Sequence, residues 1–192
     1  YMVSSGLVNR VDVSHFRLST HLFIAFLILS MIFWNYLKVK ENHNISTPIK
    51  KVIPFLFLIL IFVQIIIGAF VSGMDAGKIY NSWPLMGANY FPDDNQIDNL
   101  FNLSVFNDPS LMQFIHRNLA YFILLYYLYI FFKVYFLKIA RHFMVLKVIG
   151  GLLLVQIIFG IVTLLSGAQM FIASMHQLSS IFLISSSIYF LF

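Results

Sequence analysis

The end of the chain constrains the fold most strongly, because the 45 residues after Lys147 contain no Asp, Glu, Lys or Arg. A membrane-spanning helix needs about 20 mainly apolar residues, so this stretch is too long for one span and suits two. The turn-forming sequence Ser166-Gly167-Ala168-Gln169 divides it. It therefore predicts two transmembrane helices, at residues 148–165 and 170–192.

Three further segments of the same kind precede this pair, at residues 18–37, 52–71 and 111–132. Of the 192 residues, 60% are hydrophobic and only 10% are charged, whereas a soluble domain carries about 25% charged residues. A soluble domain of this size leaves too much surface exposed to hide so many apolar side chains, and disordered chains are poor in aromatic residues. The predicted fold class is an all-α integral membrane protein with five transmembrane helices.

The charges in the connections predict the orientation of these helices. Two connections are rich in basic residues, with Lys38, Lys40, Lys50 and Lys51 in the first and Lys133, Lys138, Arg141 and Lys147 in the second. The connection over residues 74–110 contains one Lys and five Asp. By the positive-inside rule, the basic connections face the cytoplasm or mitochondrial matrix and the acidic one faces outward. The net charge of +5 is thus explained by the bilayer and gives no indication of nucleic-acid binding.

An internal repeat relates the second and fourth segments. The sequence Val63-Gln64-Ile65-Ile66-Ile67-Gly68 recurs as Val155-Gln156-Ile157-Ile158-Phe159-Gly160. Each copy is followed by Ser-Gly and then by a helix with one His near its outer start. Chance similarity between two Ile-rich helices is the alternative, which the recurring His makes less attractive. The copies share one orientation, so we expect the last four helices to form a parallel-repeat four-helix bundle.

Three histidines lie inside the predicted spans, near their outer ends: His21, His116 and His176. Ionisable residues inside a membrane are costly and usually mark a functional site. A neutral imidazole can bind haem iron, and two facing helices can supply an axial pair. A single such His would more simply hydrogen-bond a neighbouring Ser or carbonyl. Three at one depth, two of them repeat-equivalent, favour His116 and His176 as an iron-binding pair.

The surroundings of these histidines leave two interpretations open. Ala173 and Ser180 share a helix face with His176, and such small side chains leave room for a flat ligand. Small residues also permit close helix packing in membranes, and spacing alone does not separate the two. The remaining histidines, His15, His43 and His142, are expected to be solvated at the surface.

Two arginines are candidates for contact with haem propionates, because guanidinium groups match carboxylates well. Arg17 lies one turn before His21, and Arg117 directly follows His116. The alternative for each is an extended side chain that reaches the lipid headgroups. Successive helix positions are about 100° apart, so Arg117 needs side-chain reach to share a ligand with His116.

The outer connection carries a recognisable pattern. It reads Gly73-Met74-Asp75-Ala76-Gly77-Lys78-Ile79-Tyr80-Asn81-Ser82-Trp83-Pro84-Leu85-Met86 and is followed by Gln113-Phe114-Ile115-His116-Arg117. This pattern strongly resembles the haem A synthase family of the CtaA type. The approach Val11-Asp12-Val13-Ser14, leading through Arg17-Leu18 to His21, resembles that family's fourth helix. The resemblance covers essentially the whole chain.

Members of that family have eight membrane helices in two similar four-helix halves, each with two His near the outer surface. The resemblance therefore implies that the five segments are helices four to eight of a longer protein. It implies three regions: residues 1–37 as the approach and last helix of the amino-terminal half, 38–51 as a basic cytoplasmic linker, and 52–192 as the carboxyl-terminal four-helix haem-binding half.

The resemblance also implies an enzyme, which oxidises the C8 methyl group of haem O to a formyl group and so makes haem A for terminal oxidases. His116 and His176 would hold a haem b cofactor. His21 would be the remaining ligand of the half that hosts the substrate haem O. The acidic catalytic residue of the family would precede Tyr1, so no catalytic residue is assigned within this chain.

Partners and location follow from the same resemblance. Haem O, haem O synthase, the lipid bilayer and further copies of the chain are candidate partners. No nucleotide-binding motif is present, so the electron acceptor would be another haem, a quinone or a partner protein. The expected location is the bacterial inner membrane or the mitochondrial inner membrane. Since the chain contains no Cys, disulfides and thiolate chemistry are not expected within it.

Two rival functions remain at this stage. A bis-His cytochrome b electron carrier fits the composition, the helices and the paired His equally well, and only the loop resemblance argues against it. A proton-coupled transporter would also use parallel repeats with intramembrane His. That function predicts acidic residues buried in the membrane, and the last four segments contain none.

Overall fold

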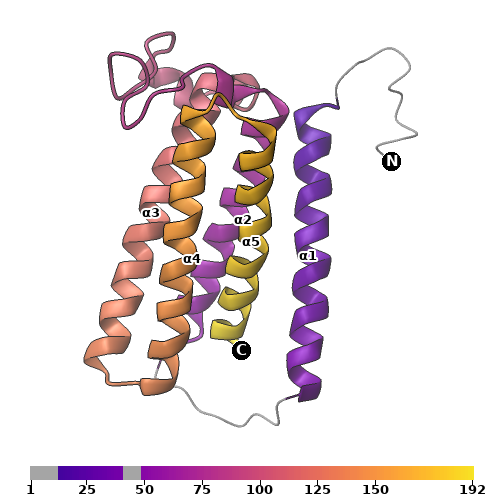
Figure 1. Cartoon of the computed structure of the whole chain (residues 1–192), viewed down its shortest axis with the longest axis vertical. Helices are drawn as coiled ribbons and strands as arrows, with labels where there is room; N and C mark the ends of the chain where they lie inside the picture. The colour runs from indigo at the N-terminus through magenta and orange to yellow at the C-terminus, as the bar shows by residue number, and fades with distance from the viewer. Residues whose placement is uncertain (1–12, 41–48) are drawn as a thin grey trace.

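The computed structural model describes residues 13–40 and 49–192. Five long helices make up this part of the chain: α1 (His15–Lys40), α2 (Val52–Gly73), α3 (Pro109–Phe136), α4 (Ala140–Leu165) and α5 (Met170–Leu191). All five are long and apolar enough to cross a membrane, and they lie side by side along one axis (Figure 1). The predicted all-α membrane fold with five spans is confirmed.

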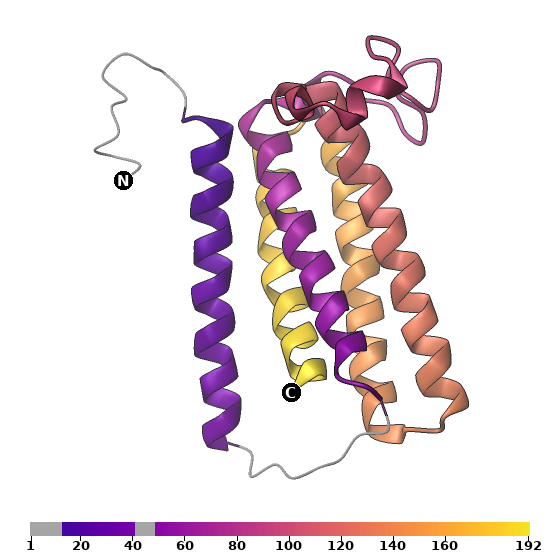
Figure 2. The same cartoon turned by 180° about the vertical axis from the view of Figure 1, so that it is seen from behind.

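The connection between α2 and α3, which we call the long loop (residues 74–108), contains three short 3₁₀ helices. These are η1 (Ala76–Lys78), η2 (Ile97–Phe101) and η3 (Leu103–Asn107). The loop lies at one end of the molecule, which we call the loop end (Figures 1 and 2). It ends where the Asp108 carboxylate accepts a hydrogen bond from the Leu111 N–H (3.0 Å) and Pro109 begins α3. Both features are favoured at helix starts.

Several helix boundaries match the sequence-based prediction. Helix α2 begins at residue 52, α4 ends at residue 165 and α5 begins at residue 170, as expected. The predicted turn before α5 is present, with Gly167 and Ala168 at φ +69° and +60°. A positive φ is the left-handed region, which Gly167 adopts readily because glycine has no Cβ.

The connection between α3 and α4 differs from the prediction. Helix α3 continues to Phe136 and α4 already begins at Ala140, so His142 and Lys147 lie on a helix and not in a connection. The reason is physical: a helix need not begin or end at the edge of the apolar zone, since a lysine in a terminal turn can extend its charged end toward water. His43, which was expected to be solvated, and most of the expected basic linker 38–51 lie outside the described residues.

The helix contacts connect all five helices. Helix α2 contacts α1, α3 and α5, while α4 contacts α3 and α5, and α1 also packs on α5. Helices α2 and α4 run toward the loop end, and α3 and α5 run away from it (Figure 1). The two repeated helix pairs, α2–α3 and α4–α5, therefore share one orientation. A separate unit of these four helices stays a prediction, since α1 packs against two of them, α2 and α5.

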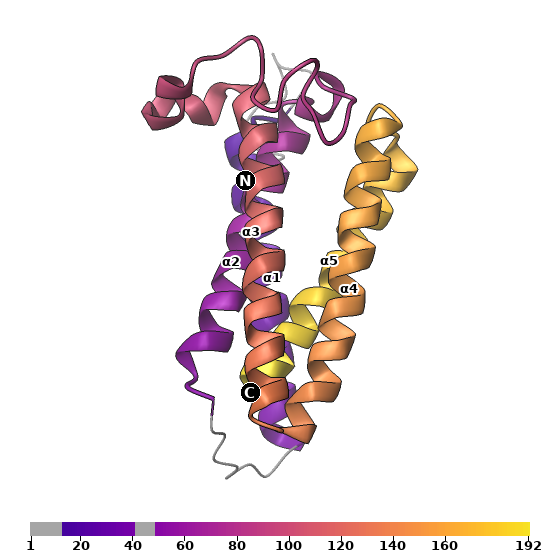
Figure 3. The same cartoon turned by 90° about the vertical axis from the view of Figure 1, so that its left-hand side faces the viewer.

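Packing is uneven along the helices. The main buried cluster includes Phe57, Ile130, Leu146 and Ile184, and on α5 the buried residues begin only at Leu183. At the loop end, α4 and α5 stand apart from the other three helices, and they converge with them at the opposite end (Figure 3). The part of the α4–α5 pair at the loop end, which carries His176, is thus the less tightly packed part.

Candidate haem site

The repeated sequence corresponds to a repeated contact. In the first copy, Gln64 on α2 donates a hydrogen bond from Nε2 to the backbone carbonyl of His116 on α3 (3.0 Å). In the second copy, Gln156 on α4 donates from Nε2 to the backbone carbonyl of His176 on α5 (3.1 Å). Each glutamine therefore ties its own helix to the histidine of the next helix.

Each copy also places a glycine against the imidazole ring. A Cβ atom added at Gly68 would lie 3.1 Å from Cε1 of His116, and one added at Gly160 would lie 3.4 Å from Cε1 of His176. The repeated glycines therefore give the rings room beside the neighbouring helix.

Each of the two imidazole rings has one nitrogen without a hydrogen-bond partner in the described part of the chain. The Nδ1 atoms of His116 and His176 are buried and have no hydrogen-bond partner within the described residues. Leaving such an atom unpaired costs about 1–3 kcal/mol, so a ligand for it would be stabilising. The two rings come from different helix pairs, His116 from α3 and His176 from α5.

The donor set fits haem. Within the described residues, no group of three or more His, Cys, Asp or Glu is arranged to hold a metal ion. A metal bound by His116 and His176 would therefore need a group that brings its own further ligands. A porphyrin does this and leaves two axial positions for imidazoles. The assignment of this pair as iron ligands stays a prediction.

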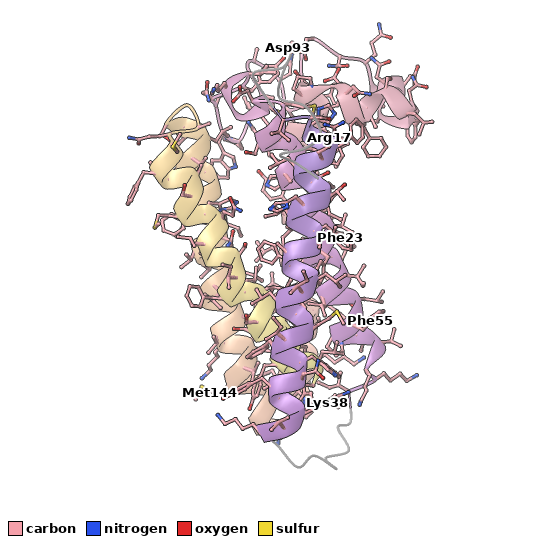
Figure 4. The ribbon with its side chains drawn as sticks, turned by 90° about the vertical axis from the view of Figure 1, so that its right-hand side faces the viewer. Arg17, Phe23, Lys38, Phe55, Asp93 and Met144 are labelled. Carbon is pink, nitrogen blue, oxygen red and sulfur yellow. The ribbon has the colours of Figure 1, made fainter. Side chains whose placement is uncertain are left out.

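His21 is not part of this pair. Its side chain is exposed on α1, and α1 packs against α2 and α5. Arg17 lies one turn closer to the loop end and is partly buried; it appears at the same end as Asp93 in Figure 4, opposite Lys38 and Met144. The predicted roles of His21 and Arg17 need residues beyond those described and stay predictions.

Arg117 has a role that sequence reasoning missed. Its guanidinium donates hydrogen bonds to the backbone carbonyls of Tyr80 and Leu85, both at 3.2 Å. The side chain of Gln113 donates to the same Tyr80 carbonyl (3.0 Å). Arg117 therefore fastens the long loop to α3, directly beside His116. A contact with a propionate stays a prediction, and it would have to coexist with these two bonds.

The long loop also reaches the second helix pair. The Asn81 side chain donates to the Leu164 carbonyl at the end of α4 (2.8 Å), and Trp83 Nε1 donates to the hydroxyl of Tyr121 on α3 (2.9 Å). The loop thus spans the ends of α3 and α4. It holds in place the two helix pairs that carry His116 and His176.

One carboxylate stabilises the loop internally. Asp94 accepts hydrogen bonds from the Ser110 hydroxyl (2.7 Å) and the Tyr80 hydroxyl (3.1 Å). Burial by itself would raise the pKa of Asp94, but the hydrogen bonds from Ser110, Tyr80 and Asn95 outweigh it and hold this pKa below its usual value. Asp94 is therefore ionised at neutral pH and joins the loop to the start of α3.

Two histidines differ from the expectation of a solvated surface position. His15 is partly buried at the start of α1, with its ring 5.5 Å from that of Phe70. His142 is partly buried on α4, where its ring meets the Phe190 ring at 5.6 Å. Both expectations are wrong for the same reason: the helices continue past the apolar segments, so their end residues pack against neighbouring helices.

The sequence offered a signal for the missed glutamines. Gln64 and Gln156 are polar residues in the middle of strongly apolar helices, at equivalent positions of the repeat. A buried amide must find hydrogen-bond partners, so the next helix was the place to look for them. The contacts to His116 and His176 supply those partners.

Known proteins provide an independent comparison. A family model described as COX15-CtaA, Cytochrome oxidase assembly protein, matches residues 1–188. The chain is 45% identical to a protein named Heme A synthase from Pelagibacter ubique, over 97% of the chain and 55% of that relative. It is 42% identical to one of the same name from Rickettsia felis, over 96% of the chain and 56% of the relative. It is 41% identical to one of the same name from Rickettsia prowazekii, over 100% of the chain and 58% of the relative.

The chain thus spans about half the length of the curated relatives it matches. No solved structure matches it.

Proposed function

The chain belongs to the COX15-CtaA family of cytochrome oxidase assembly proteins, and on that premise we propose that it is part of a haem A synthase. Such an enzyme oxidises the C8 methyl group of haem O to a formyl group. Supporting this are the relatives of that name, which are 41–45% identical over nearly the whole chain. Because they are almost twice as long, the complete activity is assigned to the full-length protein.

His116 and His176 are proposed to hold a haem b cofactor. A haem iron with two imidazole ligands supplies one-electron chemistry. The chain supplies the ligands and their placement: Gln64 and Gln156 tie each histidine backbone to the neighbouring helix. The observation that carries the proposal is this repeated arrangement of a glutamine, a ring-contacting glycine and a histidine with an unpaired buried nitrogen.

The long loop is proposed to exclude water from this site. Arg117 fastens the loop to α3 and Asn81 fastens it to α4, so that the loop bridges the two helix pairs next to the histidines. Exclusion of water strengthens electrostatic interactions inside a site. It also keeps the ring nitrogens from being satisfied by solvent.

The substrate is proposed to bind on the side of α1 that faces away from α2 and α5. His21 would ligate haem O together with a histidine from the rest of the full-length protein, and Arg17 would meet a propionate. The exposed position of His21 supports this, because a ligand shared with further helices must face away from α2 and α5. An acidic catalytic residue would come from the same part of the full-length protein.

The remaining partners are proposed on the same basis. Electrons would leave through another haem, a quinone or a partner protein. Haem O synthase and a second copy of the protein are candidate neighbours in the membrane. The membrane would be the inner membrane of a bacterium or of a mitochondrion.

The test is the haem content of cells that make haem O together with the full-length protein. Extracted haems are separated by chromatography, and haem A is expected to appear. The 192-residue chain alone is expected to produce none, because it supplies only His21 for the substrate half. Haem O that persists unchanged with the full-length protein would contradict the proposal, and haem A made by the chain alone would contradict the division between the halves.

A further inference from the structure

The two copies of the repeat differ in one hydrogen bond. In both, one amide hydrogen of the glutamine goes to the backbone carbonyl of the histidine. The amide nitrogen Nε2 of Gln64 also lies 3.4 Å from the ring nitrogen Nε2 of His116. In the second copy, the amide nitrogen of Gln156 lies instead 2.8 Å from the hydroxyl oxygen of Ser179.

The sequence explains this difference. Ser179 lies three residues after His176, whereas the position three residues after His116 is Leu119. The Ser179 hydroxyl donates to the His176 carbonyl (2.9 Å) and keeps its lone pairs available to accept from Gln156. Leucine has no acceptor, so in the first copy the second amide hydrogen has the imidazole ring as its partner.

The direction of the Gln64 contact follows from its other bond. The amide nitrogen must be the group that faces the His116 carbonyl, because only it can donate. The same nitrogen faces the ring, so Nε2 of His116 has to accept through its lone pair. The amide oxygen of Gln64 is buried and has no partner within the described part of the chain.

This contact competes with iron. A neutral imidazole has one N–H and a single nitrogen with an available lone pair. That lone pair is also the one with which the ring binds a metal. His116 therefore has to give up the Gln64 hydrogen bond before it can bind iron, whichever of its nitrogens is used. At His176 the competing hydrogen is taken up by Ser179.

We propose that Gln64 is a positioning residue that makes His116 the exchangeable ligand of the pair, whereas Ser179 leaves His176 as the permanent ligand. The proposal rests on the haem-binding function proposed above. It means that haem is held first by His176 and released last by it. It also means that the iron would lose its ligand from α3 first, so that another ligand could bind it in place of His116.

The experiment measures how fast carbon monoxide binds to the reduced full-length protein loaded with haem b. Carbon monoxide can bind only when one histidine has left the iron. An amide–imidazole hydrogen bond stabilises the open form, so its removal in Gln64→Met is expected to slow binding by roughly two- to fivefold. Leu119→Ser offers Gln64 a hydroxyl and is expected to slow binding similarly. Ser179→Ala frees the Gln156 amide and is expected to speed binding by a comparable factor.

Two controls separate this role from a structural one. Gln156→Met removes the same tie to a histidine backbone but no contact with the His176 ring, so its effect measures the structural role alone, and the slowing in Gln64→Met is expected to exceed it. Gln177→Met changes an exposed glutamine beside His176 and is expected to bind at the wild-type rate. If Gln64→Met does not take up haem, Leu119→Ser decides, because it keeps Gln64 in place.

The outcomes are distinct. Wild-type rates in Gln64→Met, or in Leu119→Ser where the first variant takes up no haem, would overturn the inference. So would equal slowing by Gln64→Met and Gln156→Met. In either case the low-spin bis-histidine spectrum of the wild-type protein would remain. Absence of that spectrum in the wild-type protein would instead contradict the proposed function.

Discussion

Replacing Gly68 by alanine tests how closely the His116 ring lies against α2. The new Cβ would lie 3.1 Å from Cε1 of His116, so the ring would have to move by a few tenths of an ångström. Overpacking of this kind costs about 1–3 kcal/mol, and we expect about 1 kcal/mol of it to fall on the haem-bound state, in which an iron bond would hold the ring in place. That cost corresponds to a loss of roughly fivefold in haem affinity.

The matched control is Gly160→Ala in the second copy. There the new Cβ would lie 3.4 Å from Cε1 of His176, which is ordinary van der Waals contact. We expect its haem affinity to stay within about twofold of the wild type. Both affinities are measured by titrating the purified full-length protein with haem b and following the absorption of the bound form. Equal losses in the two variants, or none in Gly68→Ala, would refute the reasoning.

Three further predictions concern the rest of the molecule. Gly150→Ala is expected to lower the melting temperature, because its Cβ would overlap the Tyr127 hydroxyl. Gly151→Ala is expected to leave it unchanged, since nothing among the described residues lies within 4 Å of its Cβ. Thermal unfolding in detergent compares the two variants. Since the pKa of Asp94 is lowered, the protection it gives the long loop is expected at neutral pH and is lost as the pH falls through that pKa. Proteolysis of the loop should show this dependence, and Asp94→Asn should abolish it. Single cysteines placed beside Asp94 and beside Lys138 should be labelled from opposite sides of the membrane; labelling from one side would contradict the orientation.

The fold was predictable because membrane insertion depends mainly on apolar length. The uncharged segment 52–71 and the uncharged stretch after Lys147 leave few alternatives, and the turn at Gly167 is a local feature. The start of α4 was not predictable in the same way. Helix formation continues through His142, where hydropathy falls but hydrogen bonding within the helix does not change.

The candidate site was predictable only in its repeated parts. His116 and His176 stand out because two copies of a sequence place them equally. The contacts of Arg117 depend on where the chain folds back to bring the carbonyl groups of Tyr80 and Leu85 over α3. No spacing in the sequence encodes such a contact, since backbone carbonyls are the same at every residue.

The central claim is that His116 and His176 together hold one haem iron, and optical and electron paramagnetic resonance spectra of the full-length protein test it most directly. In His116→Ala and in His176→Ala, the low-spin bis-histidine signal is expected to fall by one haem per protein, because one lost ligand leaves the iron five-coordinate or the site empty. His142→Ala, on α4 away from the pair, is expected to keep the wild-type signal. An unchanged low-spin signal in both His116→Ala and His176→Ala would contradict the account.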